Sequence, residues 1–276
     1  HNTYCEVLGI IFKQGNQMKI NKRQLLNGFI MTAFGGIEFC IQNDAHAQVN
    51  DMDIYILAGQ SNMAGRGQVE EQDKRIDPRV FSLNSSKQWT PAVEPLHFDK
   101  NIAGVGPGKA FGISMANGHK GRKIGLVPCA FGGTKISEWD KGSFMGGHYD
   151  NAISRAKTAS KDGIIKGIVW HQGESDCNSQ DAPKYYEKLK ILISNFRTDL
   201  GNNALPFVIG QLGNWNWDNF RQEVDAAHKK ITKTVPKTAF ASSSGLVHKG
   251  DNEHFDSASS RILGERLAKA MMSIGG

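Results

Sequence analysis

Short apolar runs alternate with segments of helical periodicity along most of the chain. Five apolar runs predict strands, at residues 53–58, 123–130, 164–171, 205–211 and 238–241. Four of them are almost continuously apolar, as expected for strands that are covered on both faces. Five segments have the 3.6-residue periodicity of helices, at residues 108–118, 148–160, 182–200, 218–234 and 257–273. This alternation predicts an α/β fold in which a parallel sheet carries helices on both faces.

The segment between residues 65 and 105 follows neither pattern, and we expect it to wrap the surface as irregular chain. The chain has 276 residues, without an internal repeat, a low-complexity run or a linker. We therefore predict one domain at residues 48–276, preceded by a segment of different character at residues 1–47.

The N-terminal segment has the pattern of a secretory signal. From the candidate start Met18, the basic stretch MKINKRQ leads into the apolar run LLNGFIMTAFGGIEFCI, and small residues follow at Ala45 and Ala47. The apolar run contains Glu38 and is short for a membrane span. We predict cleavage after Ala47, secretion or export to the periplasm, and no membrane association afterwards. The alternative is an amphipathic N-terminal helix.

Charge and cysteine content narrow the classes of ligand. The 33 basic and 27 acidic residues give a net charge of +6, but the basic residues are scattered and form no stripe for nucleic acid. Cys129 and Cys177 remain in the predicted mature chain and could pair after export. The position of Cys129 in a strand favours a buried thiol instead. Their spacing matches no zinc motif, and we predict neither a metal nor a cofactor.

Polar residues and glycines follow the predicted strands. They form four groups, Gly59-Gln60-Ser61-Asn62, Phe131-Gly132-Gly133-Thr134, His171-Gln172-Gly173-Glu174-Ser175 and, after the last strand, Asp251-Asn252-Glu253-His254. In a parallel sheet these groups meet at the carboxyl edge, where the active sites of α/β proteins form.

This set contains what acyl transfer needs. A serine hydroxyl is a weak nucleophile that an adjacent histidine can activate, and a carboxylate can hold the tautomer of that histidine. Glycine N–H groups and amide side chains can donate to the oxyanion. Each group also has a structural interpretation, in which Ser61 is a helix N-cap, Gly132-Gly133 a turn, and Asp251 and His254 loop residues. Their joint placement at strand ends favours catalysis.

His171 and Glu174 leave two interpretations open. They could be two ligands of a metal, although the sequence offers no third ligand. His171 could equally be a buried histidine at the end of its strand, with its ring nitrogens hydrogen-bonded.

The same residues resemble the SGNH (GDSL-like) hydrolase superfamily. The similarity is strongest to the branch of sialate O-acetylesterase-like proteins and the acetylxylan esterases of carbohydrate esterase family six. It rests on the segments ILAGQSNMAGRG, GVGPGKAFG, GLVPCAFGGTKISEW, IVWHQGESD and DNEHFD, which span Ile56 to Asp256. The resemblance implies a flavodoxin-like three-layer α/β/α sandwich with a five-stranded parallel sheet.

The resemblance also implies roles for individual residues. Ser61 would be the nucleophile and His254 its base, with Asp251 orienting that base. The oxyanion donors would be the Ser61 N–H, one glycine N–H, with Gly132 favoured over Gly133, and the Gln172 side chain. The neighbouring Gln60, Asn62, Gly133 and Glu174 would support this arrangement.

The implied reaction removes acetyl groups from a sugar. Because we expect the protein to be exported, we predict an extracellular substrate, acetylated xylan or a related plant polysaccharide. Trp215 and Trp217 in GNWNWDNF could stack on its sugar rings, unless they are core residues. Two alternatives remain: an esterase for O-acetylated sialic acid or small aryl esters, and a glycan-binding module that kept the fold without catalysis.

Overall fold

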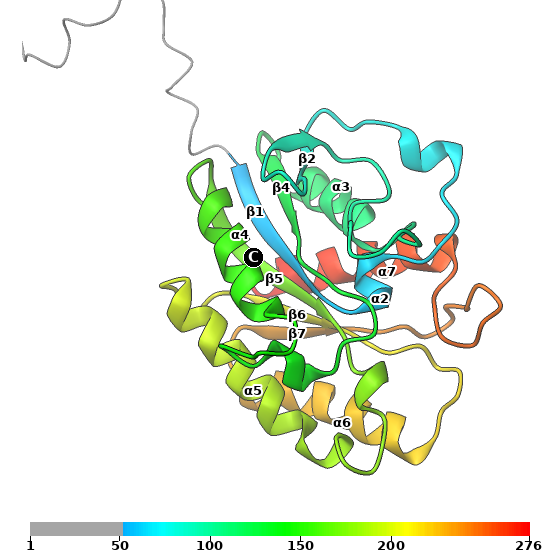
Figure 1. Cartoon of the computed structure of the whole chain (residues 1–276). Coiled ribbons are helices and arrows are strands. Elements are labelled where there is room, and N and C mark those ends of the chain that lie inside the picture. The colour runs from blue at the N-terminus through cyan, green and yellow to red at the C-terminus, as the bar shows by residue number, and fades with distance from the viewer. Residues whose placement is uncertain (1–51) are drawn as a thin grey trace, which may run out of the picture. The chain divides into compact units, whose positions relative to one another are not determined.

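The computed structural model describes residues 52–276, which form one seven-stranded sheet between two layers of helices (Figure 1). The predicted upstream segment and signal peptide, residues 1–47, lie outside the described residues. The strands are β1 (Met52–Gly59), β2 (Val80–Leu83), β3 (Trp89–Pro91), β4 (Lys123–Pro128), β5 (Ile164–His171), β6 (Phe207–Gly210) and β7 (Thr238–Ala241).

The strand order is β3-β2-β4-β1-β5-β6-β7, and all neighbours are parallel except β2 and β3. All five predicted strands are present. The prediction of a five-stranded sheet is corrected by β2 and β3, which add an edge hairpin from the segment expected to be irregular. These strands have only four and three residues and mixed polarity, so they lack a recognisable pattern.

The five predicted helices are confirmed as α3 (Gly108–Gly118), α4 (His148–Ala159), α5 (Ala182–Asp199), α6 (Asn219–Thr234) and α7 (Ser257–Ser273). Shorter helical turns are α2 (Ser61–Ala64), η3 (Glu71–Lys74), η4 (Ile136–Trp139) and η5 (Glu174–Asp176). Asp218 and Asp256 cap α6 and α7, since their carboxylates accept the N–H groups of Arg221 and Ser259.

Side chains of β1 alternate between two hydrophobic cores. Ile54 and Ile56 pack into the core under α4, α5 and α6, whereas Tyr55 and Leu57 pack into the core under α3 and α7. All four are fully buried, as expected for a central strand covered on both faces. β1 lies between β4 and β5 in the sheet. The strands that follow β1 in sequence are added first on its β4 side and then on its β5 side, so the carboxyl end of β1 is the switch point where α/β proteins place ligands.

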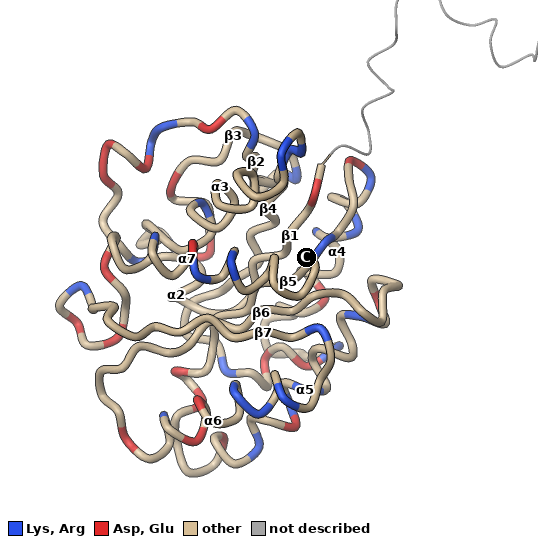
Figure 2. Tube along the Cα trace, turned by 180° about the vertical axis from the view of Figure 1, so that it is seen from behind, with Lys and Arg blue, Asp and Glu red and all other residues tan. Residues whose placement is uncertain are grey.

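The remaining sequence expectations concern charge, membrane and thiols. Lys and Arg residues are interspersed with Asp and Glu along the trace (Figure 2). Within residues 52–276, none of the helices has the length and apolar character that a membrane crossing requires. Cys129 and Cys177 are both free thiols, so the disulfide left open by the sequence is not formed.

Candidate active site

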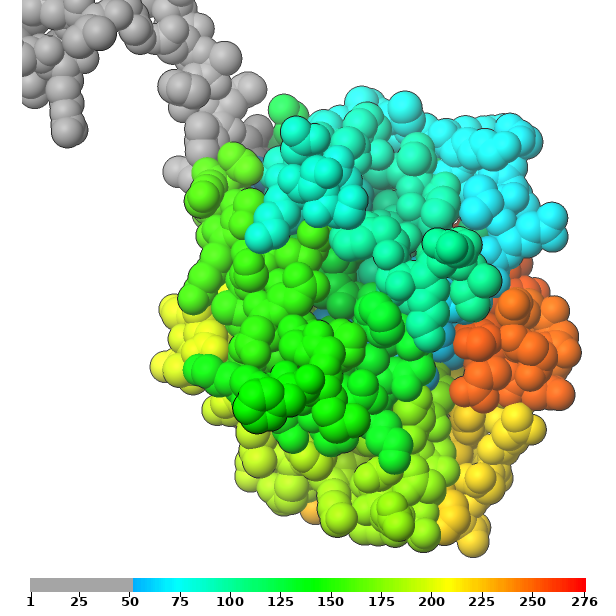
Figure 3. Space-filling view, viewed as in Figure 1, coloured from blue at the N-terminus to red at the C-terminus, as the bar shows by residue number. Residues whose placement is uncertain are grey.

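Ser61 is placed by a tight turn at the end of β1. Gly59 has φ +132, and a Cβ atom there would lie 2.1 Å from the backbone oxygen of His171, so only glycine fits. The next N–H, from Gln60, donates to that same oxygen at 2.9 Å. The chain then enters α2 with Ser61 as its first residue, 6% exposed at the switch point. In the space-filling view, atoms from the first part of the described chain reach the surface as a small blue area between teal, green and orange segments (Figure 3).

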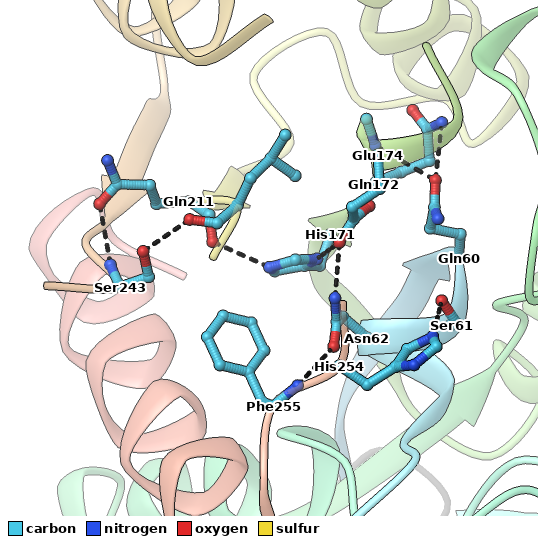
Figure 4. Close-up of polar contacts among 12 residues, drawn as sticks. Gln60, Ser61, Asn62, His171, Gln172, Glu174, Gln211, Ser243, His254 and Phe255 are labelled. Carbon is cyan, nitrogen blue, oxygen red and sulfur yellow. Dashed lines mark hydrogen bonds and ion pairs between the residues drawn. The ribbon is translucent and has the colours of Figure 1, made fainter. Parts of the chain in front are cut away.

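The loop between β7 and α7 brings His254 and Asp251 to this turn. His254 Nε2 lies 3.0 Å from Ser61 Oγ, and His254 Nδ1 lies 2.7 Å from Asp251 Oδ2 (Figure 4 shows the Ser61–His254 contact). The structure thus joins three residues in the order that the sequence predicts. This order is the geometric requirement for a serine activated by an oriented imidazole.

The Asp251 carboxylate is ionised in this arrangement. Its other oxygen, Oδ1, accepts the backbone N–H groups of Glu253 at 3.0 Å and His254 at 2.8 Å. Partial burial by itself raises the pKa of the Asp251 carboxyl, but the hydrogen bonds from His254 and Glu253 outweigh it and hold the pKa below its usual range. The Asp251 side chain is 36% exposed, so solvent screens its charge more than in a buried triad.

The glycine turn after β4 differs from the prediction. The Gly132 N–H donates to Asp99 Oδ2 at 2.9 Å, and this carboxylate also pairs with the buried Arg66 at 2.7 Å. Gly132 is therefore occupied by a structural contact. The N–H groups of Ser61 and Gly133 have no hydrogen-bond acceptor in the part of the chain that the structure describes.

Gln172 also differs from the prediction. Its Nε2 lies 3.1 Å from Gln60 Oε1, 2.9 Å from the Thr134 backbone oxygen and 2.5 Å from Asp176 Oδ2. A carboxamide has two N–H hydrogens, so these three acceptors leave none for an oxyanion. Tyr185 Oη donates to Gln172 Oε1 at 2.8 Å and completes its contacts. Gln172 ties together the chain segments that follow β1, β4 and β5, and the prediction that it is an oxyanion donor is corrected.

The other predicted supporting residues lie on the buried side of the nucleophile turn. Gln60 Oε1 accepts from Gln172 and from the Gly173 N–H at 3.4 Å. Asn62 Nδ2 donates to Glu174 Oε1 at 2.6 Å.

His171 is a buried histidine at the end of β5, with Nε2 2.9 Å from the Gln211 backbone oxygen and Nδ1 3.6 Å from Glu174. Burial lowers the pKa of His171, which is therefore neutral. Residues 52–276 contain no group of three or more His, Cys, Asp or Glu side chains that could hold a metal ion.

The two predicted sugar-stacking tryptophans have different surroundings. Trp215 is partly buried and packs edge-on against Phe255 and His248. Trp217 is 37% exposed, and its neighbour Asn216 donates to the Asn252 backbone oxygen at 2.8 Å, which joins this segment to the loop of His254. Trp217 is therefore accessible to a ligand, whereas most of the Trp215 indole is covered by neighbouring residues.

Comparison with known proteins assigns the family. A family model described as carbohydrate esterase, sialic acid-specific acetylesterase, matches residues 51–273. The chain belongs to this family. A curated Arabidopsis thaliana protein named "Probable carbohydrate esterase At4g34215" is 35% identical to this esterase over 241 residues, which cover 80% of this chain and 90% of that protein. The predicted family and enzyme class, a carboxylic ester hydrolase acting on acetylated carbohydrate, are thereby confirmed.

Solved structures show the same fold. An X-ray structure of the Arabidopsis thaliana protein AT4G34215 aligns with this esterase at a TM-score of 0.74 and 32% identity, over 82% of this chain and all of that one (100%). NanS aligns at a TM-score of 0.66 and 17% identity, over 81% of this chain and 97% of that one. XAC1771, a carbohydrate acetylesterase from Xanthomonas citri, aligns at a TM-score of 0.65 and 22% identity, over 81% of this chain and 56% of that one. The α/β/α sandwich predicted from the sequence is confirmed.

Proposed function

We propose that Ser61 is the nucleophile, His254 its general base and Asp251 the residue that orients the base. The observation that carries this proposal is the continuous contact from Ser61 Oγ to His254 Nε2 and from His254 Nδ1 to Asp251 Oδ2. We further propose that the oxyanion donors are the N–H groups of Ser61 and Gly133, because both lack an acceptor in residues 52–276.

In this mechanism the acetyl group passes through Ser61. Ser61 Oγ forms a bond to the carbonyl carbon while His254 takes its proton. The bond from that carbon to the sugar oxygen then breaks, and His254 returns the proton to the departing hydroxyl. A water molecule attacks the acetyl-serine with His254 again as base, which releases acetate and restores Ser61.

The substrate class that we propose first is acetylated xylan or a related plant polysaccharide. The exposed indole of Trp217 beside the His254 loop supports a substrate with several sugar rings. O-acetylated sialic acid is the second candidate, supported by the description of the matched family. Acetate release from acetylated xylan and from O-acetylated sialic acid, measured side by side, distinguishes them through the ratio of kcat/KM.

Hydrolysis of an aryl acetate should proceed in the presence of a chelator. A serine mechanism supplies nucleophile, base and oxyanion donors from the chain itself, so a metal has no step to perform. The measurement is the release of phenol from an aryl acetate before and after dialysis against EDTA. Activity that disappears on dialysis and returns with zinc would contradict the serine mechanism.

The replacement Trp217→Ala should raise KM for an acetylated oligosaccharide by about 3- to 10-fold. Loss of one stacking surface removes roughly 0.5–1.5 kcal/mol, which corresponds to this range. KM for an aryl acetate, which has no sugar ring to stack, should not change. Phe220→Ala is a matched control, because Phe220 is also 37% exposed and lies in the first turn of α6. An equal effect of both replacements would indicate loosening of this segment and would reject the stacking role.

A further inference from the structure

The side chain of Asn62 contacts both peptide groups that flank His254. Its Nδ2 donates to the Glu253 backbone oxygen at 3.1 Å. Its Oδ1 accepts the Phe255 N–H at 3.1 Å (Figure 4). The second Nδ2 hydrogen goes to Glu174 Oε1 at 2.6 Å. Both amide hydrogens and the amide oxygen are thus used, in a site where Asn62 is 3% exposed. One side chain, next in sequence to Ser61, holds the backbone on either side of His254.

Asp251 cannot supply this attachment. It lies three residues before His254, and its contacts are all within the same loop: the His254 ring, the N–H groups of Glu253 and His254, and the Lys249 ammonium at 3.6 Å. These bonds fix the imidazole relative to its loop but move together with that loop. The distance from His254 Nε2 to Ser61 Oγ depends on what joins the loop to the nucleophile turn.

Asn62 makes the most direct join between these two segments. Two other side chains also contact this loop. Arg221 lies 3.4 Å from the Glu253 carboxylate, and Asn216 donates a hydrogen bond to the Asn252 backbone oxygen at 2.8 Å. Both originate in or just before α6, on a different element from Ser61. Asn62 is the α2 side chain that hydrogen-bonds the backbone of this loop, so a shift of α2 relative to the loop would break both of these bonds.

Glu174 holds the Asn62 amide from behind. It follows β5, is 9% exposed, and accepts a hydrogen bond of 2.6 Å from Asn62 Nδ2. This contact selects the orientation in which Nδ2 faces Glu253 and Oδ1 faces Phe255. Glu174 thus acts on His254 through Asn62.

We infer that Asn62 is a positioning residue that sets His254 against Ser61, and that Glu174 acts through Asn62. This inference rests on the proposed roles of Ser61 and His254. The inference explains how a carboxylate as exposed as Asp251 can belong to a working triad. The position of His254 relative to Ser61 is set by buried groups and not by Asp251.

Four variants test the inference with an aryl acetate as substrate. Asn62→Ala should lower kcat by about 10²-fold with KM changed less than about 3-fold, since a misplacement near 1 Å has this cost. Glu174→Ala should lower kcat in the same way, by about 10-fold. Glu174→Gln keeps an oxygen acceptor for Asn62 Nδ2, and should retain kcat within about 3-fold of the wild type. The double variant Asn62→Ala/Glu174→Ala should be no worse than Asn62→Ala.

Ser243→Ala is the matched structural control. Ser243 Oγ donates to the Leu212 backbone oxygen at 2.6 Å, is 1% exposed, and touches neither Ser61 nor His254. It should lower the melting temperature about as much as Asn62→Ala while leaving kcat unchanged. If Asn62→Ala does not fold, the contrast between Glu174→Gln and Glu174→Ala carries the test.

Two results would overturn the inference. One is a kcat for Asn62→Ala within about 3-fold of the wild type, and the other is multiplication of the two losses in the double variant. Ser61→Ala separates this failure from failure of the proposed function. If Ser61→Ala stays active, the serine mechanism itself is wrong; if it is inactive while Asn62→Ala is not, only the positioning role is rejected.

Discussion

Replacing Ser61 or His254 with alanine is expected to lower kcat for an aryl acetate by roughly 10³- to 10⁶-fold in each case. The 3.0 Å contact between Ser61 Oγ and His254 Nε2 makes them one unit, because the hydroxyl attacks only as its proton leaves to the imidazole. Loss of either partner therefore removes the same step. The double variant should be little worse than either single variant, and the residual activity should come from the oxyanion donors and substrate binding.

This expectation is tested by measuring kcat of the three variants in steady-state kinetics, with melting curves to establish that each variant is folded. Ser82→Ala is a matched control, since Ser82 on β2 is 5% exposed, close to the 6% of Ser61, and has no contact with His254. It should keep wild-type kcat. Losses that multiply in the double variant would show that Ser61 and His254 act in separate steps.

The sequence predicted the central part of the fold because burial on both faces leaves a strong pattern. The sequences of β1 and β5 are almost continuously apolar and lead into glycine and polar residues, and both segments are strands in the structure. β3 is a three-residue edge strand with exposed positions, and β2, which lies between β3 and β4, has only four residues. Both are too short to show a strand pattern of their own, and β2 forms through its pairing with the neighbouring β4. Such strands have no local signal for sequence analysis to detect.

The candidate site was predictable as a set of segments but not as a set of hydrogen bonds. Ser61, Asp251 and His254 come together because their segments follow strands that share one sheet edge. Which N–H groups stay free is decided by partners far away in sequence. Asp99, from the segment expected to be irregular, takes the Gly132 N–H, and only the folded chain shows this contact.

Gln172 illustrates the same limit. The family resemblance implied that Gln172 donates to the oxyanion, yet Thr134 and Asp176 accept its hydrogens inside the protein. A side chain at a strand end can turn outward or inward, and the buried acceptors decide the direction. The sequence held no indication that a turn 38 residues earlier would present the Thr134 oxygen.

Asp251→Asn is expected to lower kcat by about 10³- to 10⁴-fold, more than the larger truncation Asp251→Ala, for which we expect about 10²-fold. The reason lies in the two N–H groups that Oδ1 accepts, from Glu253 and His254. In Asp251→Asn the amide oxygen takes that place, which turns the amide NH₂ toward His254 Nδ1. The NH₂ then donates to Nδ1 and keeps the imidazole proton on Nε2, where it blocks proton transfer from Ser61.

Asp251→Ala has no such effect on the tautomer. The Asp251 side chain is 36% exposed, so solvent enters the space that it leaves and can accept from Nδ1–H. Asp251→Ser should fall between the two, since its hydroxyl can accept one N–H and does not impose a tautomer. The measurement combines kcat for the three variants with ¹⁵N chemical shifts of the His254 ring, which report the proton position directly. A kcat for Asp251→Ala below that of Asp251→Asn, in a folded protein, would show that the charge of Asp251 matters more than the tautomer it selects.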